Sequence, residues 1–548
     1  MRATKMTKSI SISRLLLAPI MALFLAAAAQ ASTPGISGTT FNLVAQTAFL
    51  NQPDGSAVYS WGYGCLNTTG ITFVPTAITT ATCPTMQVPG PTLVVKEGQT
   101  ITVNLTNQLP TAAGNASILF PGFQVTTTGG VTGLLTQEAA PGGTVTYTFT
   151  AGSPGTHPYY SGTQGDLQIE MGLYGAVIVI PAGDPTGCDP AQVALSNANP
   201  LVETAHGEVD FRLAHYAYDH CKSAYDREYL FQWAEMDSNI HKQALAQVSA
   251  KIGCVVTDPT CRLEVPTEPY HPAYFLINGR SMPDDMDANY GAEYPHQPYN
   301  GNPHMHPGEQ VLVRAIGQGR WQHPFHEHGN HVRILGRDGN LILSQSDSTD
   351  LAGLLMFNTD TTPGQAFEGI FYWTGRGLNW DPYGHHSGTD AFNDPNTEPP
   401  CSADVNGYYT VNSPSPAPVG AINYYEWCQD HNKPLEVAPL GSDVGGGGPA
   451  TLPDPNIFTN GPWYGGTPYL GPDASLRAFA PNCAGTPNAG CTPLQPFNTQ
   501  ANPANERGYA FMWHSHNERE ITTNNLFPGG MLMMMLVDSR EFVNDESN

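Results

Sequence analysis

Residues 323–329 are HPFHEHG, and residues 513–516 are WHSH. In an extended strand, residues two apart project from the same face. The last two histidines of the first motif therefore share a face, as do the two histidines of the second. If the strands are neighbours, four imidazoles gather around one or two metal ions, and neutral imidazole suits copper, zinc, iron and nickel. The first histidine of 323–329 and the serine of 513–516 have the opposite parity and are expected to face a second location. The predicted metal ligands are His323, His326, His328, His514 and His516.

The alternative to a metal site is a histidine core held by hydrogen bonds. A single His-x-His pair is a weak signal, because most such pairs lie at the surface or in a satisfied core. Two pairs in one chain, one of them extended to His-x-x-His-x-His, favour metal binding.

Apolar patterns around these motifs predict strands. Every second residue is apolar in several segments, which is typical of strands with one buried face. Residues 176–180 (AVIVI) form a continuous apolar run, which indicates a strand buried on both faces. Residues 240–252 are one of the few stretches with helical spacing. The alternating segments are Ile101/Val103/Leu105, Val145/Tyr147/Phe149 and Val311/Val313/Ala315.

The composition agrees with an all-β chain. Its 548 residues include 57 Gly and 48 Pro, while only 13% are charged, which favours short strands joined by turns over long helices. The formal net charge of -25 makes binding to nucleic acid or to an anionic membrane unfavourable. No heptad pattern or fixed-period repeat appears, which excludes coiled coils and helical repeats.

The domain plan that follows has four parts. Residues 1–31 combine basic residues, an apolar run and an Ala-Gln-Ala cleavage pattern, and predict a secretory signal peptide. Residues 32–181 form a first β-sandwich, 182–270 a helix-containing connecting region, and 271–548 a second β unit. Within the second unit, residues 376–505 form a long Gly- and Pro-rich insertion. No other segment reaches membrane-spanning length.

Export and disulfides are linked expectations. Removing four basic residues with the signal peptide leaves 18 Lys+Arg against 47 acids, a charge of 18 − 47 = −29. The predicted location is periplasmic or extracellular, where disulfides persist. The ten cysteines lie in five close pairs, and sequential pairing would join loops within a domain. The pairs are Cys65/Cys83, Cys188/Cys221, Cys254/Cys261, Cys401/Cys428 and Cys483/Cys491.

The two histidine motifs resemble those of one protein family. HPFHEHG is similar to the HPxHxHG signature of multicopper oxidases, and WHSH resembles their HCH signature. The resemblance implies two cupredoxin-like Greek-key β-sandwich domains, bound copper and oxidoreductase activity. Further resemblance lies in residues 88–92, 98 and 101–107 (the family's first strands), 172–176 (the end of that domain) and 276–280 (the opening of a later one).

The departures from the family are as informative as the match. The family builds a three-copper cluster from four paired-histidine motifs and holds a blue copper ion with one cysteine between two histidines. Here Ser515 replaces that cysteine, Glu520 stands at its second histidine, and Met531 aligns loosely with the axial position. The resemblance therefore implies a reduced, histidine-bound centre with no blue-copper site, and a separate hard site at His323 and Glu520. Leu119, Pro121, Tyr160 and Gly162 occupy the ligand positions of the first two motifs.

Other residues carry weaker signals. His304-Met305-His306 is a third His-x-His pair, and residues 531–537 contain a methionine run that suggests either copper transport or apolar packing. The remaining candidates are more typical of surface or loop residues. They are His157, His331 and His385-His386, with Glu327, Glu518 and Glu520 as possible general acids.

Three hypotheses remain open from the sequence. The chain is an oxidoreductase with a reduced copper centre that reacts with dioxygen or a small reductant, a non-catalytic copper-binding or buffering protein, or a cupredoxin scaffold with a structural or interaction role. Copper is implied by the resemblance, and geometry alone equally allows zinc. The substrate is not readable. Two-domain members of the family often assemble as trimers, so a homo-oligomer is a further hypothesis.

Overall fold

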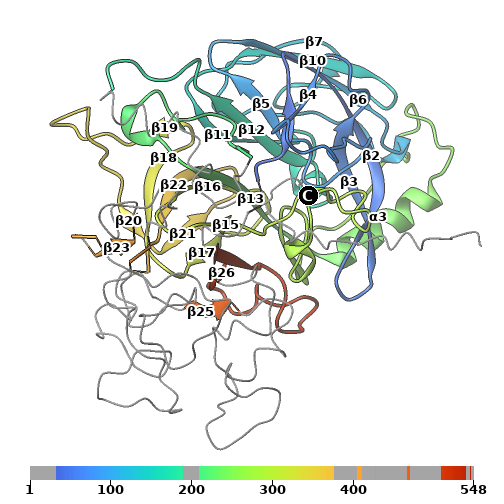
Figure 1. Cartoon of the computed structure of the whole chain (residues 1–548). Helices are drawn as coiled ribbons and strands as arrows, with labels where there is room; N and C mark the ends of the chain where they lie inside the picture. The colour runs from blue at the N-terminus through green and yellow to red at the C-terminus, as the bar shows by residue number, and fades with distance from the viewer. Residues whose placement is uncertain are drawn as a thin grey trace, which may run out of the picture.

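The computed structural model describes residues 32–188, 209–375 and 508–538, the short stretches 404–405, 407–409, 426–427 and 466–469, and residue 544. Almost all of its elements are strands, which form two β-sandwiches (Figure 1). The all-β prediction is confirmed. The predicted signal peptide and most of the predicted insertion lie outside the described residues.

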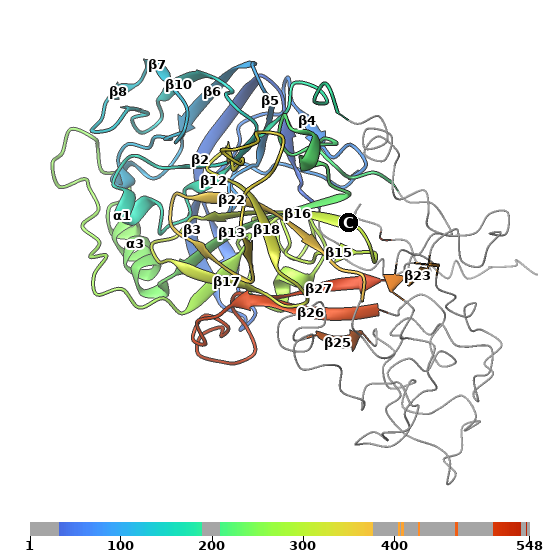
Figure 2. The ribbon, with the colours of Figure 1, turned by 90° about the vertical axis from the view of Figure 1, so that its left-hand side faces the viewer.

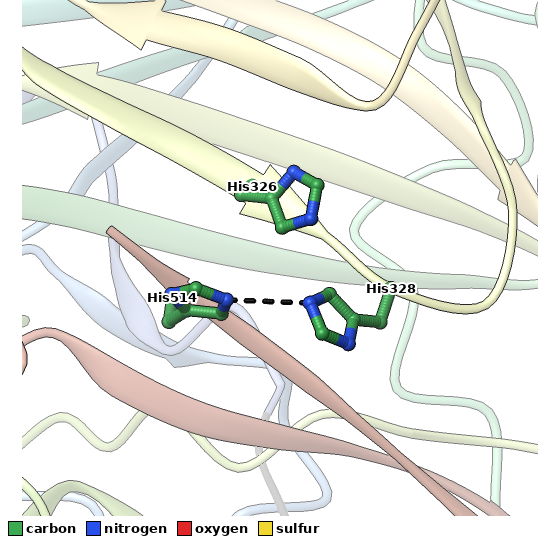
Figure 3. A group of neighbouring side chains, drawn as sticks. All are labelled: His326, His328 and His514. Carbon is green, nitrogen blue, oxygen red and sulfur yellow. Dashed lines mark hydrogen bonds between the residues drawn. The ribbon is translucent and has the colours of Figure 1, made fainter. Parts of the chain in front are cut away.

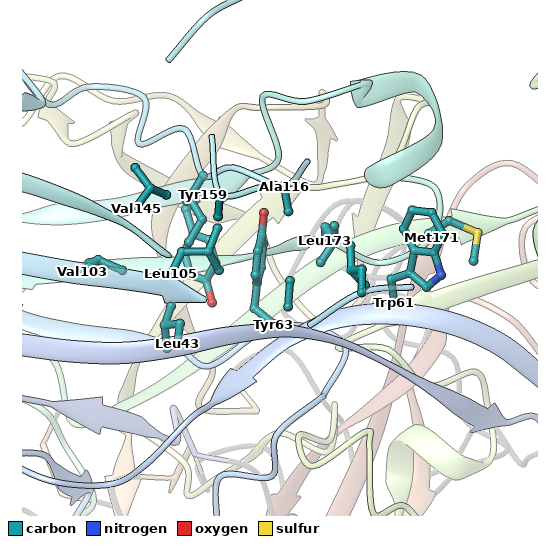
Figure 4. Packing of buried hydrophobic residues seen from close by; sticks show 14 of the residues in the cluster. Leu43, Trp61, Tyr63, Val103, Leu105, Ala116, Val145, Tyr159, Met171 and Leu173 are labelled. Atoms are coloured by element: carbon teal, nitrogen blue, oxygen red, sulfur yellow. The ribbon is translucent and has the colours of Figure 1, made fainter. Parts of the chain in front are cut away.

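The first sandwich consists of two five-stranded sheets. Along β6 (Thr100–Asn107) and β10 (Thr144–Thr150), alternate side chains are buried, because one face of each strand packs against the opposite sheet. Figure 4 shows this core, in which Trp61, Tyr63 and Leu105 lie between the sheets. One sheet contains, in order, β11 (Gly155–Tyr160), β12 (Tyr174–Ile180), β5 (Leu93–Lys96), β1 (Gly35–Ser37) and β4 (Thr72–Val74). The other contains β3 (Ala57–Cys65), β2 (Thr40–Asn51), β6 (Thr100–Asn107), β10 (Thr144–Thr150) and β7 (Thr126–Gly129).

The second sandwich has a seven-stranded and a six-stranded sheet, with a core between them that is rich in aromatic residues and methionine. The first sheet contains β14 (Tyr274–Ile277), β13 (Arg227–Met236), β16 (Gln310–Gly317), β22 (Ala366–Tyr372), β18 (Val332–Arg337) and β19 (Asn340–Leu341), with β20 (Leu355–Met356) paired to β18. The second, which we call the histidine sheet, contains β15 (His304–Met305), β27 (Leu532–Asp538), β26 (Gly508–Ser515), β17 (His323–Glu327) and β21 (Asn358–Thr361), with β25 (Gly466–Tyr469) paired to β26. Figure 2 shows β26 and β27 in red beneath the first sheet.

The two sandwiches pack on each other through β12. Its odd-numbered side chains lie in the core of the first sandwich, and its even-numbered ones contact residues of the second. Ile178, for example, packs with Leu230 and Ile316. The prediction that residues 176–180 are buried on both faces is confirmed, and the second face is the contact between sandwiches.

The stretch predicted to connect the domains contains a strand of the second sandwich. β13 runs parallel to β16 and antiparallel to β14. The domain limits at 181 and 270 stay predictions, and these pairings favour placing β13 with the second unit. The predicted helix near 240–252 is α3 (Ser238–Ala250), which begins where the Asp237 side chain accepts a hydrogen bond from the backbone N–H of Asn239. Ile240 and Ala244 pack α3 into the core of the first sandwich.

The remaining elements are short. They are α1 (Gly165–Gln168), the 3-10 turns η1 (Thr111–Ala113), η3 (Cys221–Ser223) and η4 (Asp284–Met286), and the strand pairs β8 (Val131–Thr132) with β9 (Gln137–Glu138) and β23 (Tyr408–Tyr409) with β24 (Glu426–Trp427). Within the described part of the chain, no helix is long and apolar enough to cross a membrane.

Three of the predicted disulfides are present. Cys65–Cys83, Cys188–Cys221 and Cys254–Cys261 close loops of 18, 33 and 7 residues, as sequential pairing predicts. The other two predicted pairs lie outside the described residues.

Candidate metal centre

The two histidine motifs lie on neighbouring antiparallel strands. In the β17–β26 pair, His326 is opposite His514. Phe325 and Trp513 belong to the core of the second sandwich, so strand alternation directs His326 and His514 to the other face of the histidine sheet. His328 follows the end of β17, and its carbonyl accepts a hydrogen bond from the Trp513 indole N–H. This is the juxtaposition that the two-residue spacing predicted.

Three imidazoles converge at this face (Figure 3). One ring nitrogen from each of His326, His328 and His514 lies within 4.8 Å of the other two. Nε2 of His328 and Nε2 of His514 are 3.3 Å apart. The exposed His516 is adjacent, with its ring centroid 4.8 Å from that of His326. The donor set fits an imidazole-bound copper ion, and zinc by geometry. The ligand roles of these four residues stay a prediction.

Burial keeps two of these imidazoles neutral. Burial, with a smaller effect of the neighbouring histidines, lowers the pKa of His326 to about 4. Burial also lowers the pKa of His514. Nδ1 of His514 lies 2.7 Å from the carbonyl oxygen of Ser515, to which it donates when the ring is neutral. That tautomer leaves Nε2 with a lone pair, which is the usual arrangement of a metal-ligating histidine.

His323 lies on the opposite face of β17, apart from the other histidines. Its Nδ1 is 2.9 Å from Glu520 Oε2, and its Nε2 is 2.9 Å from Glu235 Oε2. All three side chains are buried. Burial opposes a charge on His323, but the hydrogen bonds to the two carboxylates outweigh it and raise its pKa to about 9. An imidazolium with both N–H groups engaged has no lone pair for a metal. His323 as a ligand stays a prediction, and these contacts favour an ion-paired role.

His323, Glu235 and Glu520 form an ion cluster, and the residues at the predicted blue-copper positions join it. Ser515 Oγ donates to Glu520 Oε2 at 2.5 Å, and Asn517 Nδ2 donates to Glu520 Oε1 at 2.8 Å. Met531 is buried in the apolar core. A hydroxyl, a carboxylate and a protonated imidazole do not supply the thiolate and neutral imidazoles that a blue copper ion requires. These residues therefore do not fit that group.

Glu235 extends the ion cluster toward the first sandwich. Its Oε1 accepts two backbone N–H groups, at 2.7 and 2.9 Å. The Tyr270 hydroxyl lies 3.1 Å from Glu235 and 2.6 Å from Glu170. Burial and the two carboxylates raise the pKa of Tyr270 well above its usual value, so the hydroxyl stays a donor. Glu170 in turn lies 3.5 Å from His241. A buried polar chain thus links the two sandwiches behind the histidines.

The first-sandwich positions that the resemblance aligns with family ligands hold other side chains. Leu119 and Tyr160 exchange backbone hydrogen bonds of 2.7 and 3.3 Å, so the two segments are neighbours. A Cβ added at Gly162 would come within 2.8 Å of the Leu119 side chain. The space between the segments is therefore packed with apolar atoms, and these positions offer no imidazole.

The three candidate general acids have different surroundings. Glu327 faces the core, and burial raises its pKa well above the usual range. Its Oε2 has no hydrogen-bond partner among the described residues. Glu520 faces His323. Glu518 is exposed and interacts electrostatically with His514. Of the three acids, it is therefore the one that lies on the same face of the histidine sheet as the converging imidazoles.

Sequence reasoning missed Glu235, Glu170 and Tyr270. A signal for Glu235 was present, because it continues the alternation of Tyr229, Phe231 and Trp233, whose side chains lie in the core. An acidic residue at an inward position demands a partner. Nothing local in the sequence pointed to Glu170 or Tyr270.

Part of the chain is similar to a known protein family. Residues 70–184 match the family model described as multicopper oxidase. An L-ascorbate oxidase from Brassica rapa subsp. pekinensis is 40% identical over 99 residues, which cover 17% of this chain and 16% of that protein. Laccase 1 of Metarhizium robertsii is 36% identical over 104 residues, covering 18% and 16%. The chain's resemblance to multicopper oxidases is confirmed.

Similar solved structures include the multicopper oxidase mgLAC, at 13% identity and TM-score 0.43, covering 91% of this chain and 85% of that one. A blue copper oxidase from Nitrosomonas europaea matches at 14% identity and TM-score 0.42, covering 90% and 85%. The curated relatives are matched over about a sixth of their length, and the family match lies in the first sandwich. Both histidine motifs lie beyond it.

Proposed function

We propose that the whole chain, of which residues 70–184 match the multicopper oxidase family model, is an exported copper-binding oxidoreductase with a reduced, histidine-ligated centre and no blue-copper site. The convergence of the His326, His328 and His514 ring nitrogens within 4.8 Å carries this proposal. Copper held there supplies one-electron redox chemistry with dioxygen or a small reductant. Zinc is a competing occupant by geometry alone.

The chain's own residues set what the centre does. The three buried or half-buried imidazoles hold the ion, and the exposed His516 lies where it completes the set or yields its place to a reactant. Glu518 is an exposed carboxylate on the same side of the sheet. In the proposed oxidoreductase, it donates or accepts the proton. Export to the periplasm or outside the cell rests on the predicted signal peptide.

A second function is favoured by the ion cluster at His323. Substrate oxidation in the family passes electrons through the blue-copper cysteine. Ser515 has a hydroxyl in place of that thiolate, and the hydroxyl donates to Glu520, so it cannot carry electrons in this way. This observation supports a non-catalytic protein that binds or buffers copper through the same histidines.

The first experiment measures metal content, visible absorption and electron paramagnetic resonance on the mature, copper-loaded protein. His514→Ala removes a converging ligand, and His271→Ala, an exposed histidine outside the cluster, is the matched control. We expect one or two copper equivalents without an intense blue band, and loss of copper in His514→Ala only.

Activity separates the two functions. Dioxygen consumption with a reductant, lost in His514→Ala and retained in His271→Ala, supports the oxidoreductase. Copper binding without turnover supports the buffering protein. Equal copper in the wild type and His514→Ala, or an intense blue band, contradicts the proposed centre.

A further inference from the structure

One candidate ligand, His328, lies outside the strands that hold the other two. His326 and His514 are opposite each other on β17 and β26, so the strand pairing fixes their backbone. β17 ends at Glu327, and the side chain of His328 comes from the bend that follows it (Figure 3). A metal ligand has to be held to within about 0.5 Å of its working position. Other contacts must therefore fix His328.

Strand β26 supplies two of these contacts. The backbone N–H of His328 donates to the Met512 carbonyl at 3.2 Å, and the carbonyl of His328 accepts the Trp513 indole N–H at 3.0 Å. The first bond uses only backbone atoms, so a substitution in β26 can leave it intact. The second bond depends on one side chain, because its donor is the indole ring of Trp513.

The bend itself packs against β26. Gly329 has a φ of 102°, which favours glycine, and a Cβ at this position would come within 2.8 Å of the Phe511 ring. Phe511 and Trp513 are two residues apart on β26, and both belong to the core of the second sandwich. The segment after β17 therefore passes directly over one of these side chains and is hydrogen-bonded to the other.

The indole of Trp513 is a rigid anchor. It is fully buried, and its ring lies edge-on to aromatic rings from three different strands. The ring centroids are 5.0 Å apart for Phe371, 5.9 Å for Phe325 and 6.3 Å for Phe231. Close packing of this kind fixes the indole, so the core sets the direction of its N–H and, with it, the position of the His328 carbonyl.

Two other buried indoles show that the bond is not a general requirement of this fold. The N–H groups of Trp61 and Trp233 have no hydrogen-bond partner among the described residues, although both rings are fully buried. Burying a tryptophan in this chain therefore does not by itself call for an acceptor. The acceptor found at Trp513 is the backbone of a candidate metal ligand.

We propose that Trp513 is a positioning residue of the candidate metal centre, and that its indole N–H holds the His328 carbonyl and thereby sets the place of the His328 imidazole. The inference rests on the proposed copper centre. Without the indole N–H, the bend after β17 is held less firmly, whereas strand pairing still holds His326 and His514. The copper ion should then lose one imidazole and keep the other two.

The test uses Trp513→Phe in the mature chain, which keeps an aromatic ring in the core but removes the N–H. Trp233→Phe is the matched control, because Trp233 is equally buried in the same core and its N–H has no hydrogen-bond partner among the described residues. Copper affinity and electron paramagnetic resonance are measured on the copper-loaded proteins, and amide hydrogen exchange on the metal-free proteins. Circular dichroism and thermal melts check the fold.

We expect Trp513→Phe to bind copper about 10- to 100-fold more weakly than the wild type, as loss of an orienting partner does at other metal sites. Its paramagnetic resonance spectrum should show one fewer coupled imidazole nitrogen, and the amides of residues 328–330 should exchange faster. Trp233→Phe should match the wild type in all three measurements. A merely structural role for Trp513 would lower the melting temperature of both variants without changing the nitrogen coupling.

The outcomes separate this inference from the proposed function. Wild-type copper affinity, nitrogen coupling and exchange in folded Trp513→Phe overturn the positioning role and leave the copper centre standing. A wild type that binds no copper overturns the centre and the positioning role together. If Trp513→Phe does not fold, a crystal structure of the copper-loaded wild type decides. Copper on His328 with the indole bond intact at about 2.7–3.2 Å supports the role, and copper without His328, or a broken bond, overturns it.

Discussion

Replacing His323 with glutamine is predicted to change how stability depends on pH. The pKa of His323 is raised from 6.5 to about 9 by Glu235 and Glu520, despite burial. The folded chain therefore holds this proton more tightly than the unfolded chain does. The sign follows from linkage: the stabilisation is fully present below pH 6.5 and is lost as pH rises through about 9. A shift of this size corresponds to roughly 3 kcal/mol.

The assay is the melting temperature of metal-free wild type and His323→Gln between about pH 6 and pH 10. At pH 6 the variant leaves two buried carboxylates without their cation, and breaking such a pair costs about 3–5 kcal/mol. At pH 10 the wild type has lost the same charge, so the difference narrows by roughly 3 kcal/mol, or about 6–12 °C for a sandwich of this size. His271→Gln is the control and should follow the wild type. Parallel curves for wild type and His323→Gln would refute the ion-pair assignment.

Three further predictions follow from single side chains. Burial lowers the pKa of His157 to about 4, so the wild type should lose stability as pH falls from 6.5 through 4. In His157→Gln, the melting temperature should fall less over the same pH range. Ser515→Cys alone should give no intense blue absorption after copper loading, because Glu235 and Glu520 still occupy both nitrogens of His323; a blue spectrum would contradict this. Glu327→Leu should stabilise the protein by about 1–3 kcal/mol at neutral pH, because it removes a fully buried carboxyl whose Oε2 has no hydrogen-bond partner among the described residues. A lower melting temperature would show instead that the carboxyl makes a stabilising contact.

Strand periodicity made much of the fold and centre predictable. The alternation in residues 101–105 and 145–149 appears as β6 and β10 with alternate side chains buried, and the run at 176–180 appears as the doubly buried β12. The two-residue spacing of His326 and His328 placed both on one side of β17. Short-range rules suffice here, because strand geometry alone decides which side chains share a face.

Long-range partners were beyond the reach of the sequence. The spacing of His323 gave its parity, but the carboxylates that hold it come from residues 88 and 197 positions away. Their contribution decides whether the ring is a ligand or a cation. Asp538 likewise lies 234 positions from His304, whose Nδ1 is 2.8 Å from its carboxylate. Sequence patterns predict faces of strands well, but the pairing of faces depends on the whole packed chain.

The alternation of β17 and β26 also separates the ion cluster at His323 from the converging histidines. His323 and Ser515 point inward and meet Glu520, whereas His326 and His514 point outward and meet His328. A substitution in the inward set should therefore move no outward ring. Sites on opposite faces of one strand pair share backbone but no side-chain partner, so their perturbations should be nearly additive. His323→Gln should then leave copper binding at the outward histidines almost unchanged, and a joint loss of both would show that the backbone between them transmits strain.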